Sequence, residues 1–142
     1  PITASVGLEF LFVEVTDTAA LGRARAHIPT FDLIRASHRV EGVHIYAKST
    51  TPNSARIRAR NLSPYDGIGE DSATGSATAS LVALLAQCDP RADCDFILEA
   101  HQGIEMGRPS LLHGHAKKRA GKVAPPHVSG RCVQVMRGTI SI

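Results

Sequence analysis

One stretch restricts what this chain can fold into more than any other. Residues 77–86, ATASLVALLA, carry no charge, and their two polar members are small. A helix that is apolar on every side has to be buried. We therefore predict one buried helix over about residues 76–87, at the centre of the domain, with an Ala-rich first half that lets neighbouring backbone come close.

Strand-like segments lie on both sides of this helix in the sequence. Residues 54–62 alternate, with Ile57 and Ala59 on one face and three arginines on the other, which is the period of a half-buried strand. We expect the arginine face to be solvated, with a domain interface or an anion-attracting rim as the alternatives. Further strands are predicted, from β-branched and aromatic content or from flanking turn residues, at residues 8–15, 43–47, 94–102, 110–115, 131–136 and 139–142.

Two short helices complete the expected elements. One covers residues 18–26 with Asp17 as its cap, and the other runs from Thr30 to about residue 38. The basic run at residues 117–119 is expected to be a solvated turn. Many strands around one buried helix make an α+β domain.

The composition is that of an ordinary globular domain, with 43% hydrophobic and 20% charged residues over a length of 142. No apolar run reaches the roughly 20 residues that cross a bilayer. A net charge of +3 and few aromatic residues argue against nucleic-acid binding. The three cysteines lack metal-binding spacing. We expect one cytoplasmic domain over residues 1–142, without a membrane, nucleic-acid or metal partner.

Residues 67–76, GIGEDSATGS, form a loop directly before the buried helix. Thr74 and Ser76 are favourable capping residues, and Gly75 lets a ligand approach the backbone. The first turn of a helix leaves N–H groups without partners, so this end attracts a carboxylate or phosphate. The loop lacks the lysine of a P-loop, and nucleotide binding is therefore discounted.

Asp71 stands just before the helix start. A carboxylate there could orient a substrate amine or hydroxyl, or move a proton. Acidic residues before helices also serve as simple caps. Composition alone leaves open whether Glu70 and Asp71 do more than that.

Two ordered motifs carry a family resemblance. Residues 67–77, GIGEDSATGSA, resemble the G-x-x-E-D-P-A-T-G-S-A signature of PhzF-like proteins, the phenazine-biosynthesis isomerase family. Residues 102–110 resemble that family's Q-G-x-x-M-G-R-P-S block. Residues 7–13 resemble the strand that opens its second domain, and residues 128–133 a later V-x-G-x-x-V strand.

The resemblance implies the diaminopimelate-epimerase-like fold, in which two similar domains each wrap a β-barrel-like mixed sheet around a central helix. The substrate lies between the two domains. Family members carry out proton shifts and isomerisations on small carboxylic acids, without cofactor or metal. By this resemblance Asp71 is the catalytic residue, and Gly75, Ser76 and Thr74 hold the substrate carboxylate.

The sequence departs from the family pattern in two ways. Ser72 replaces the usual proline, which loosens the loop more than it changes the chemistry. The family's main acid/base, a glutamate of the first domain, has no matching region here. We therefore expect a single PhzF-like C-terminal domain that is inactive alone, with the N-terminal half absent and supplied by a PhzF-like N-terminal domain or a second copy. The alternative is a domain that binds carboxylates or dimerises without catalysis.

Two further features concern the residue at position 71 and a pair of histidines. Diaminopimelate epimerases and proline racemases have a cysteine where this loop has Asp71, which disfavours a two-thiol racemisation. His113 and His115 could share one strand face, but a metal usually needs a third or fourth ligand. We expect no metal there.

Overall fold

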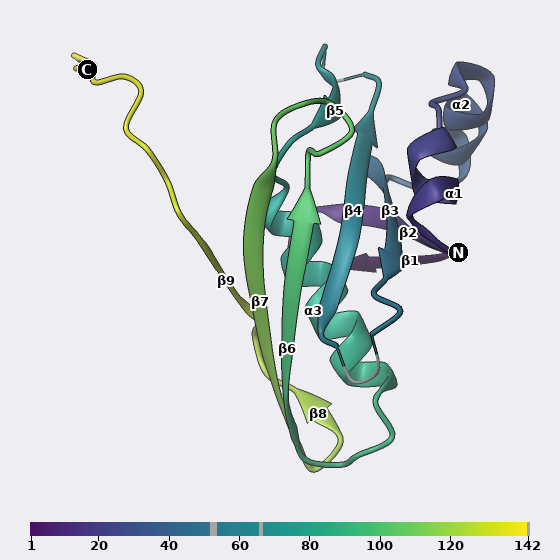
Figure 1. The fold of residues 1–142 in the computed structure, drawn as a ribbon, viewed down its shortest axis with the longest axis vertical. Helices are drawn as coiled ribbons and strands as arrows, with labels where there is room; N and C mark the ends of the chain where they lie inside the picture. Colours follow the sequence, from purple (N-terminus) through teal and green to yellow (C-terminus); the bar gives the residue numbers. More distant parts are fainter. Residues whose placement is uncertain (52–53, 66, 142) are drawn as a thin grey trace.

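The computed structural model describes residues 1–51, 54–65 and 67–141 (Figure 1). Its helices are α1 (Thr18–Arg23), α2 (Ile28–Ser37) and α3 (Gly75–Cys88). Its strands are β1 (Ile2–Ser5), β2 (Glu9–Val15), β3 (Gly42–Lys48), β4 (Arg56–Ser63), β5 (Gly69–Asp71), β6 (Cys94–Gln102), β7 (Ser110–Arg119), β8 (Lys122–Val123) and β9 (His127–Gly130).

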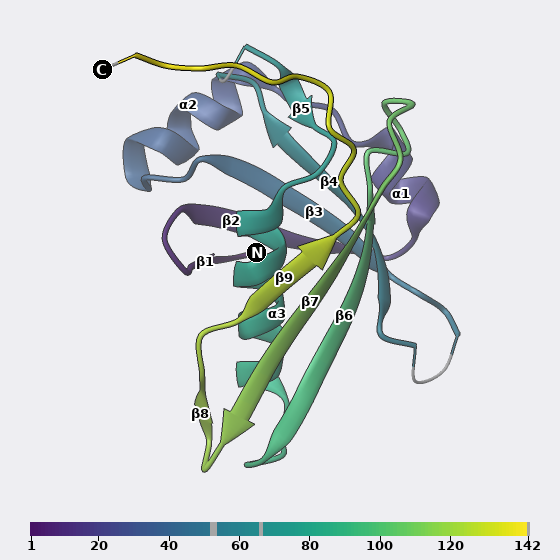
Figure 2. The same cartoon turned by 90° about the vertical axis from the view of Figure 1, so that its left-hand side faces the viewer.

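The described strands form one mixed sheet in the order β1-β2-β3-β4-β6-β7-β8, with β5 paired to β4 and β9 paired to β7. β2–β3 and β4–β6 are parallel, and the other pairs are antiparallel. Figure 2 shows β1 and β2 crossing the direction of β6 and β7, with α3 between them. The sheet therefore curls around α3 as a half-barrel, and α3 contacts strands from both ends of it.

α3 lies in the main core and extends one residue beyond the predicted helix at each end. Ala77, Leu81, Val82 and Ala86 are completely buried. They pack against Phe10 and Phe12 of β2 and against apolar residues of β3, β4, β6 and β7, among them Tyr46, Ile57, Ala59, Leu98, Ala100 and Leu112. The small side chains let the sheet close in on the helix, as its composition predicted.

A second, smaller core lies on the outer face of the sheet. Phe31 of α2 packs there with Val43 of β3 and Leu62 of β4. Figure 1 places α1 and α2 on the same side of the sheet, and Figure 2 shows that they lie apart from each other. α1 is capped as predicted, since Asp17 accepts a hydrogen bond from Ala20 N at 2.7 Å.

The alternation of residues 54–62 is confirmed for its apolar side, where Ile57 and Ala59 are buried. The expectation of a solvated arginine face is wrong for Arg60, which is buried and paired with Glu70. Arg56 pairs with Glu99 at 2.8 Å. Arg58 Nε lies 2.8 Å from Glu105 Oε1, a charge contact without hydrogen-bond alignment. Each arginine thus has an acidic partner.

Two predictions near the C-terminal end are wrong. The basic run is not a turn, because β7 continues to Arg119 and buries Lys118, whose Nζ donates to the carbonyls of Gln87 and Asp89 at the end of α3. Residues 131–141 form no strand, and Val133 is 86% exposed. A strand needs a neighbour for its backbone groups, and none of the described strands pairs with this segment. Position 142 lies outside the described residues.

Candidate active site

The site is built where two strands end on one edge of β4. β6 pairs with the first half of β4 and ends with Gln102 opposite Ala59. β5 pairs with the second half and ends with Asp71 opposite Asn61. Because Ala59 and Asn61 are two residues apart on β4, the ends of β5 and β6 meet there. The predicted loop therefore contains a short strand, and this strand fixes the position of Asp71.

The Asp71 carboxylate is held by the residues that follow it. Its Oδ2 accepts a hydrogen bond from the Thr74 hydroxyl at 2.8 Å, and its Oδ1 accepts a longer one from Ala73 N at 3.3 Å. Asp71 is half-buried. Glu70 points to the other face of the sheet, where it binds Arg60. The two acidic residues thus have different roles, and only Asp71 faces the helix start.

Gln102 joins the two motifs, although it was not among the predicted site residues. It is completely buried. Its Nε2 donates to Asp71 O and to the Thr74 hydroxyl, both at 2.8 Å, and its Oε1 accepts from Thr74 N at 3.2 Å. The available signal was a glutamine next to a glycine, on the face of β6 that is otherwise apolar. A buried amide needs hydrogen-bond partners.

Gly103 lets the second motif pack against the first. Its φ is +77°, and a Cβ there would lie 2.2 Å from Arg108 O and 2.9 Å from Ser72 O. Arg108 N donates to Gly103 O at 2.8 Å, which closes the turn after β6. Only glycine allows both the backbone angle and this close approach.

The start of α3 is open. Thr74 is the N-cap residue, but its side chain makes no capping hydrogen bond. The first helical bond runs from Thr78 N to Thr74 O, so the N–H groups of Gly75, Ser76 and Ala77 have no acceptor within the helix. Within the described chain nothing lies within 4 Å of a Cβ placed on Gly75.

This opening belongs to a groove of about 970 Å³. Its lining includes Ala73, Gly75, Ser110 and Arg131. Unpaired N–H groups, the helix dipole and an arginine all favour a bound anion. Of the four predicted site residues, Gly75 lines this groove. Asp71, Thr74 and the half-buried Ser76 lie beside it in the chain but are not among the lining residues. What each does to a substrate stays a prediction.

His44 is buried in the same face of the sheet. Cross-strand pairs join His44 to Asn61 and Asn61 to Asp71. The imidazole Nδ1 lies 3.4 Å from Asn61 Oδ1, and its Nε2 has no hydrogen-bond partner. Burial lowers the pKa of His44 to about 4, and the nearby Asp71 opposes this only in part. His44 is therefore neutral near pH 7.

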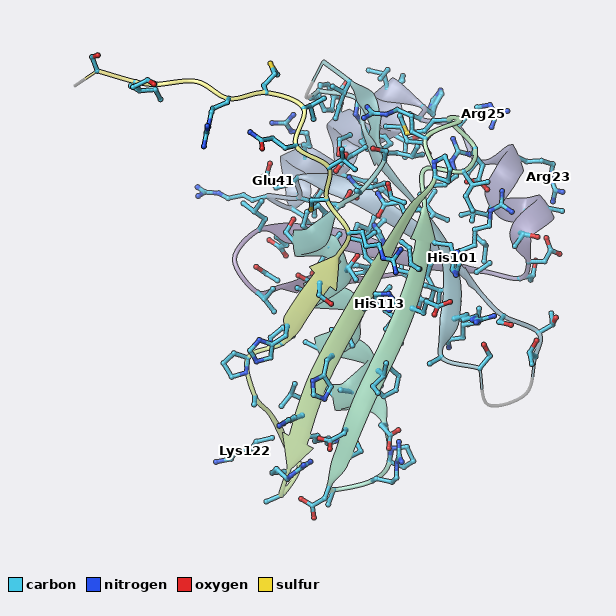
Figure 3. All side chains as sticks on the ribbon, turned by 60° about the vertical axis from the view of Figure 1, so that its left-hand side comes forward. Arg23, Arg25, Glu41, His101, His113 and Lys122 are labelled. Carbon is cyan, nitrogen blue, oxygen red and sulfur yellow. The ribbon has the colours of Figure 1, made fainter. Side chains whose placement is uncertain are left out.

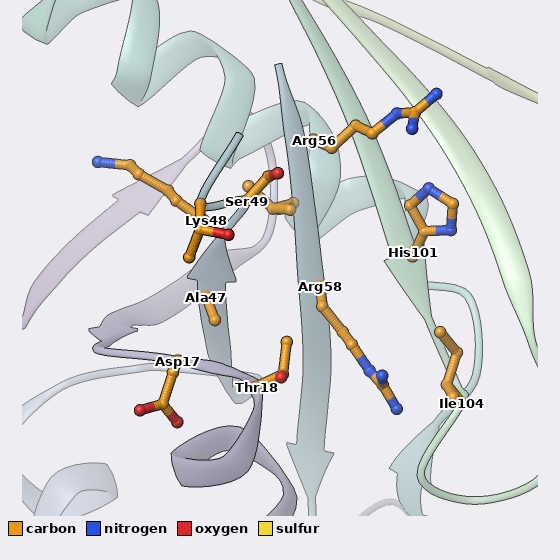
Figure 4. Close-up of a pocket in the computed structure, with 11 residues that line it drawn as sticks. Asp17, Thr18, Ala47, Lys48, Ser49, Arg56, Arg58, His101 and Ile104 are labelled. Atoms are coloured by element: carbon orange, nitrogen blue, oxygen red, sulfur yellow. The ribbon is translucent and has the colours of Figure 1, made fainter. Parts of the chain in front are cut away.

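Another pocket, of about 380 Å³, lies between β3, β4 and β6 and includes neither Asp71 nor α3 (Figure 4). Lys48, Arg56 and Arg58 line it, but their charged ends point in different directions. Lys48 is paired with Glu14 at 2.8 Å. Arg56 and Arg58 are likewise next to Glu99 and Glu105. Such a lining has no convergent anion-binding point.

The histidines of β6 and β7 form no metal site with the other described residues. His101 of β6 and His113 of β7 are marked in Figure 3, and His101 Nε2 lies 2.8 Å from Glu99. Among the described residues, no group of three or more His, Cys, Asp or Glu side chains could hold a metal ion. In the same part of the chain, no helix is both long and apolar enough to cross a membrane.

The chain is similar to known proteins over nearly its whole length. The family described as phenazine biosynthesis-like protein matches residues 1–138. Trans-2,3-dihydro-3-hydroxyanthranilate isomerase of Pseudomonas fluorescens is 36% identical over 118 residues, covering 80% of this chain and 42% of that protein. An uncharacterized isomerase of Mesorhizobium japonicum is 27% identical over 141 residues, covering 97% of this chain and 47% of that protein. The chain thus spans less than half the length of these relatives.

The predicted fold is confirmed by a solved structure. The crystal structure of a Bacillus anthracis phenazine biosynthesis protein of the PhzF family superposes with a TM-score of 0.67 at 22% identity, covering 84% of this chain and 41% of that one. The shared architecture is a mixed half-barrel sheet with few helices, the diaminopimelate-epimerase-like fold.

Proposed function

The chain belongs to the phenazine biosynthesis-like protein family, and we propose that it contributes the Asp71 side of an isomerase active site acting on a small carboxylic acid. The observation that carries the proposal is the position of the Asp71 carboxylate. It accepts a hydrogen bond from Thr74, which is also the N-cap residue at the open start of α3. A proton-transfer group and an anion-binding helix end are thus adjacent. Relatives named as isomerases support the reaction class.

In the proposed complex the substrate carboxylate accepts hydrogen bonds from N–H groups of Gly75, Ser76 and Ala77. The Ser76 hydroxyl and the Arg131 guanidinium are further donors. Preorganised donors of this kind hold an anion without reorganising, which is why they favour both binding and catalysis. Bound there, the substrate lies beside Asp71, whose carboxylate gives or takes a proton from a neighbouring carbon or heteroatom.

The second proton-transfer group comes, in this proposal, from outside residues 1–142. The family resemblance assigns it to a glutamate on a preceding domain, and the relatives are more than twice as long as the segment that matches. A PhzF-like N-terminal domain would supply this glutamate and complete the cleft. A second copy of this chain would cover the cleft without supplying the glutamate. The reaction needs neither a metal nor a cofactor, because proton transfer between two carboxyl groups and a carbon acid is sufficient.

The test uses trans-2,3-dihydro-3-hydroxyanthranilate, the substrate in the relative's name, in D2O. The chain alone should neither isomerise it nor introduce deuterium. With a PhzF-like N-terminal domain added, both signals should appear, and Asp71→Asn should reduce the rate roughly 100-fold or more. Asp95→Asn, an exposed acid on β6, is the matched control. Turnover by the chain alone, or an unaffected Asp71→Asn rate, would exclude the proposal in this form.

The second candidate is carboxylate binding without turnover. The unpaired N–H groups at Gly75 and the adjoining groove favour it, since they need no second domain. Benzoate should then move the Gly75 amide resonance in an NMR titration. The assay above should show neither isomerisation nor deuterium incorporation, with or without an added N-terminal domain.

A further inference from the structure

We propose that Gln102 is a positioning residue for Asp71: it directs the Thr74 hydroxyl hydrogen onto Asp71 Oδ2 and leaves Oδ1 as the oxygen that exchanges protons. The inference rests on the proposed role of Asp71. Gln102 does not touch the groove, because it is completely buried under the junction of β5 and β6. Gln102 contacts the backbone carbonyl of Asp71 directly, and it acts on the Asp71 carboxylate through Thr74.

The orientation of the Gln102 amide follows from two backbone groups. Its Oε1 faces Thr74 N at 3.2 Å, and a backbone N–H can only donate. Its Nε2 faces Asp71 O at 2.8 Å, and a carbonyl can only accept. Turning the amide over would put donor against donor and acceptor against acceptor. The nitrogen must therefore be the atom that faces the Thr74 hydroxyl at 2.8 Å.

This orientation decides where the Thr74 hydrogen goes. A hydroxyl has one hydrogen, and Thr74 Oγ1 already accepts from Gln102 Nε2. Its hydrogen is then free for Asp71 Oδ2, which lies 2.8 Å away. Oδ2 is fixed as an acceptor, whereas Oδ1 has only the 3.3 Å contact with Ala73 N. The weakly bound Oδ1 is the oxygen left for a substrate proton.

The same arrangement keeps the helix start open. A threonine at the N-cap position normally satisfies a first-turn N–H group with its own side-chain oxygen. Thr74 does not, because its hydroxyl is engaged by Gln102 and Asp71. One buried glutamine thus serves both halves of the site, the carboxylate and the unpaired N–H groups.

NMR on the ligand-free chain tests the hydrogen bonds directly. Both Gln102 side-chain amide hydrogens should exchange with water far more slowly than those of the exposed Gln134, and the Thr74 hydroxyl hydrogen should be observable. If the Gln102 hydrogens exchange at the Gln134 rate, the hydrogen bonds from Gln102 to Asp71 and Thr74 do not exist in solution.

A double-mutant cycle separates positioning from simple packing. Thr74→Val should displace the Asp71 carboxyl carbon resonance, because Oδ2 loses its donor. Gln102→Leu should also displace it, and the double variant should match Thr74→Val alone, since Gln102 then has no hydroxyl to direct. Additive displacements would show that Gln102 acts on Asp71 by another route. Gln134→Leu is the matched control and should displace nothing.

Gln102→Glu covers the case in which the leucine variant does not fold. It has nearly the same shape, but an oxygen replaces the donor that faces Thr74. It should therefore turn the hydroxyl away from Asp71 and displace the carboxyl resonance, and an unmoved resonance would overturn the inference. These readouts need no substrate. The two proposals can fail separately. If the Thr74 and Gln102 substitutions are coupled but Asp71→Asn keeps full isomerase activity, the proposed function is rejected and the Gln102 geometry stands.

Discussion

Arg60 and Glu70 form a two-point ion pair that joins β4 to β5. Arg60 Nε donates to Oε1 at 2.9 Å and Nη2 donates to Oε2 at 2.7 Å, with side-chain exposures of 8% and 14%. Glu70 raises the pKa of Arg60. Arg60 Nη1 also donates to the Leu21 and Ala24 carbonyls at the end of α1. The pair therefore holds the strand that ends in Asp71.

Replacing Glu70 by glutamine should destabilise the fold. The Arg60 charge would stay buried with an amide group facing its Nη2, and breaking a buried pair in this way costs about 3 kcal/mol. Urea unfolding measures the loss. Asp95→Asn removes the exposed partner of Arg119, whose side chain is 57% exposed, and should cost less than about 1 kcal/mol. Equal losses would mean that the Arg60–Glu70 pair contributes no more to the free energy of unfolding than a surface pair does.

Gly103→Ala should be far more harmful than Gly107→Ala. Both glycines have positive φ, +77° and +75°, so both variants carry the backbone strain of about 1 kcal/mol. Only at Gly103 does the new Cβ also meet Arg108 O at 2.2 Å, whereas at Gly107 it meets nothing within 4 Å. Thermal unfolding of the two variants provides the comparison, and similar midpoints would contradict the close packing at Gly103.

His44 should make stability depend on pH between about 6.5 and 4. Its pKa in the folded state is lowered from 6.5 to about 4 by burial. In this window the unfolded chain binds a proton that the folded chain does not, so the free energy of unfolding falls as the pH is lowered, by roughly 3 kcal/mol in all. Above pH 6.5 this contribution to stability is fully present.

The check is urea unfolding at several pH values, with His44→Asn beside the native chain. Carboxylates titrate in the lower part of the same window, among them Glu14 and Glu99 with lowered pKa values, so the difference between the two proteins is the relevant quantity. The asparagine variant should have the shallower pH dependence. His38→Asn, at an exposed histidine, should keep the native slope.

Gly75→Ala should weaken ligand binding without destabilising the fold. Its Cβ meets nothing within 4 Å, so the unfolding midpoint should stay the same or rise slightly. A ligand carboxylate that approaches the Gly75 N–H would meet the new methyl group, and benzoate affinity should fall roughly tenfold, about 1.4 kcal/mol. Gly22→Ala in α1, also with nothing within 4 Å, should leave the affinity unchanged. Unchanged affinity at Gly75→Ala would place the anion elsewhere.

Local pattern predicted much of the fold. The uncharged stretch at residues 77–86 identified α3, and period-two alternation identified β4, because both signals depend only on near neighbours in the chain. β6 was predicted with its observed bounds, Cys94–Gln102. The same local signals wrongly predicted strands at residues 131–136 and 139–141, whose strand-like composition does not provide the neighbour that a strand needs.

The sequence by itself determined that residues 77–86 form a core helix and that a loop precedes it, since composition and motif order are properties of contiguous residues. Only the tertiary structure decided that Gln102 meets Asp71 and that Arg60 binds Glu70. The Gln102–Asp71 contact depends on β5 and β6 ending on one edge of β4, which brings residues 31 positions apart within hydrogen-bond distance. The Arg60–Glu70 contact depends on the pairing of β5 with β4. Strand order in a sheet is set by the packing of the whole chain around α3, and no local period encodes it.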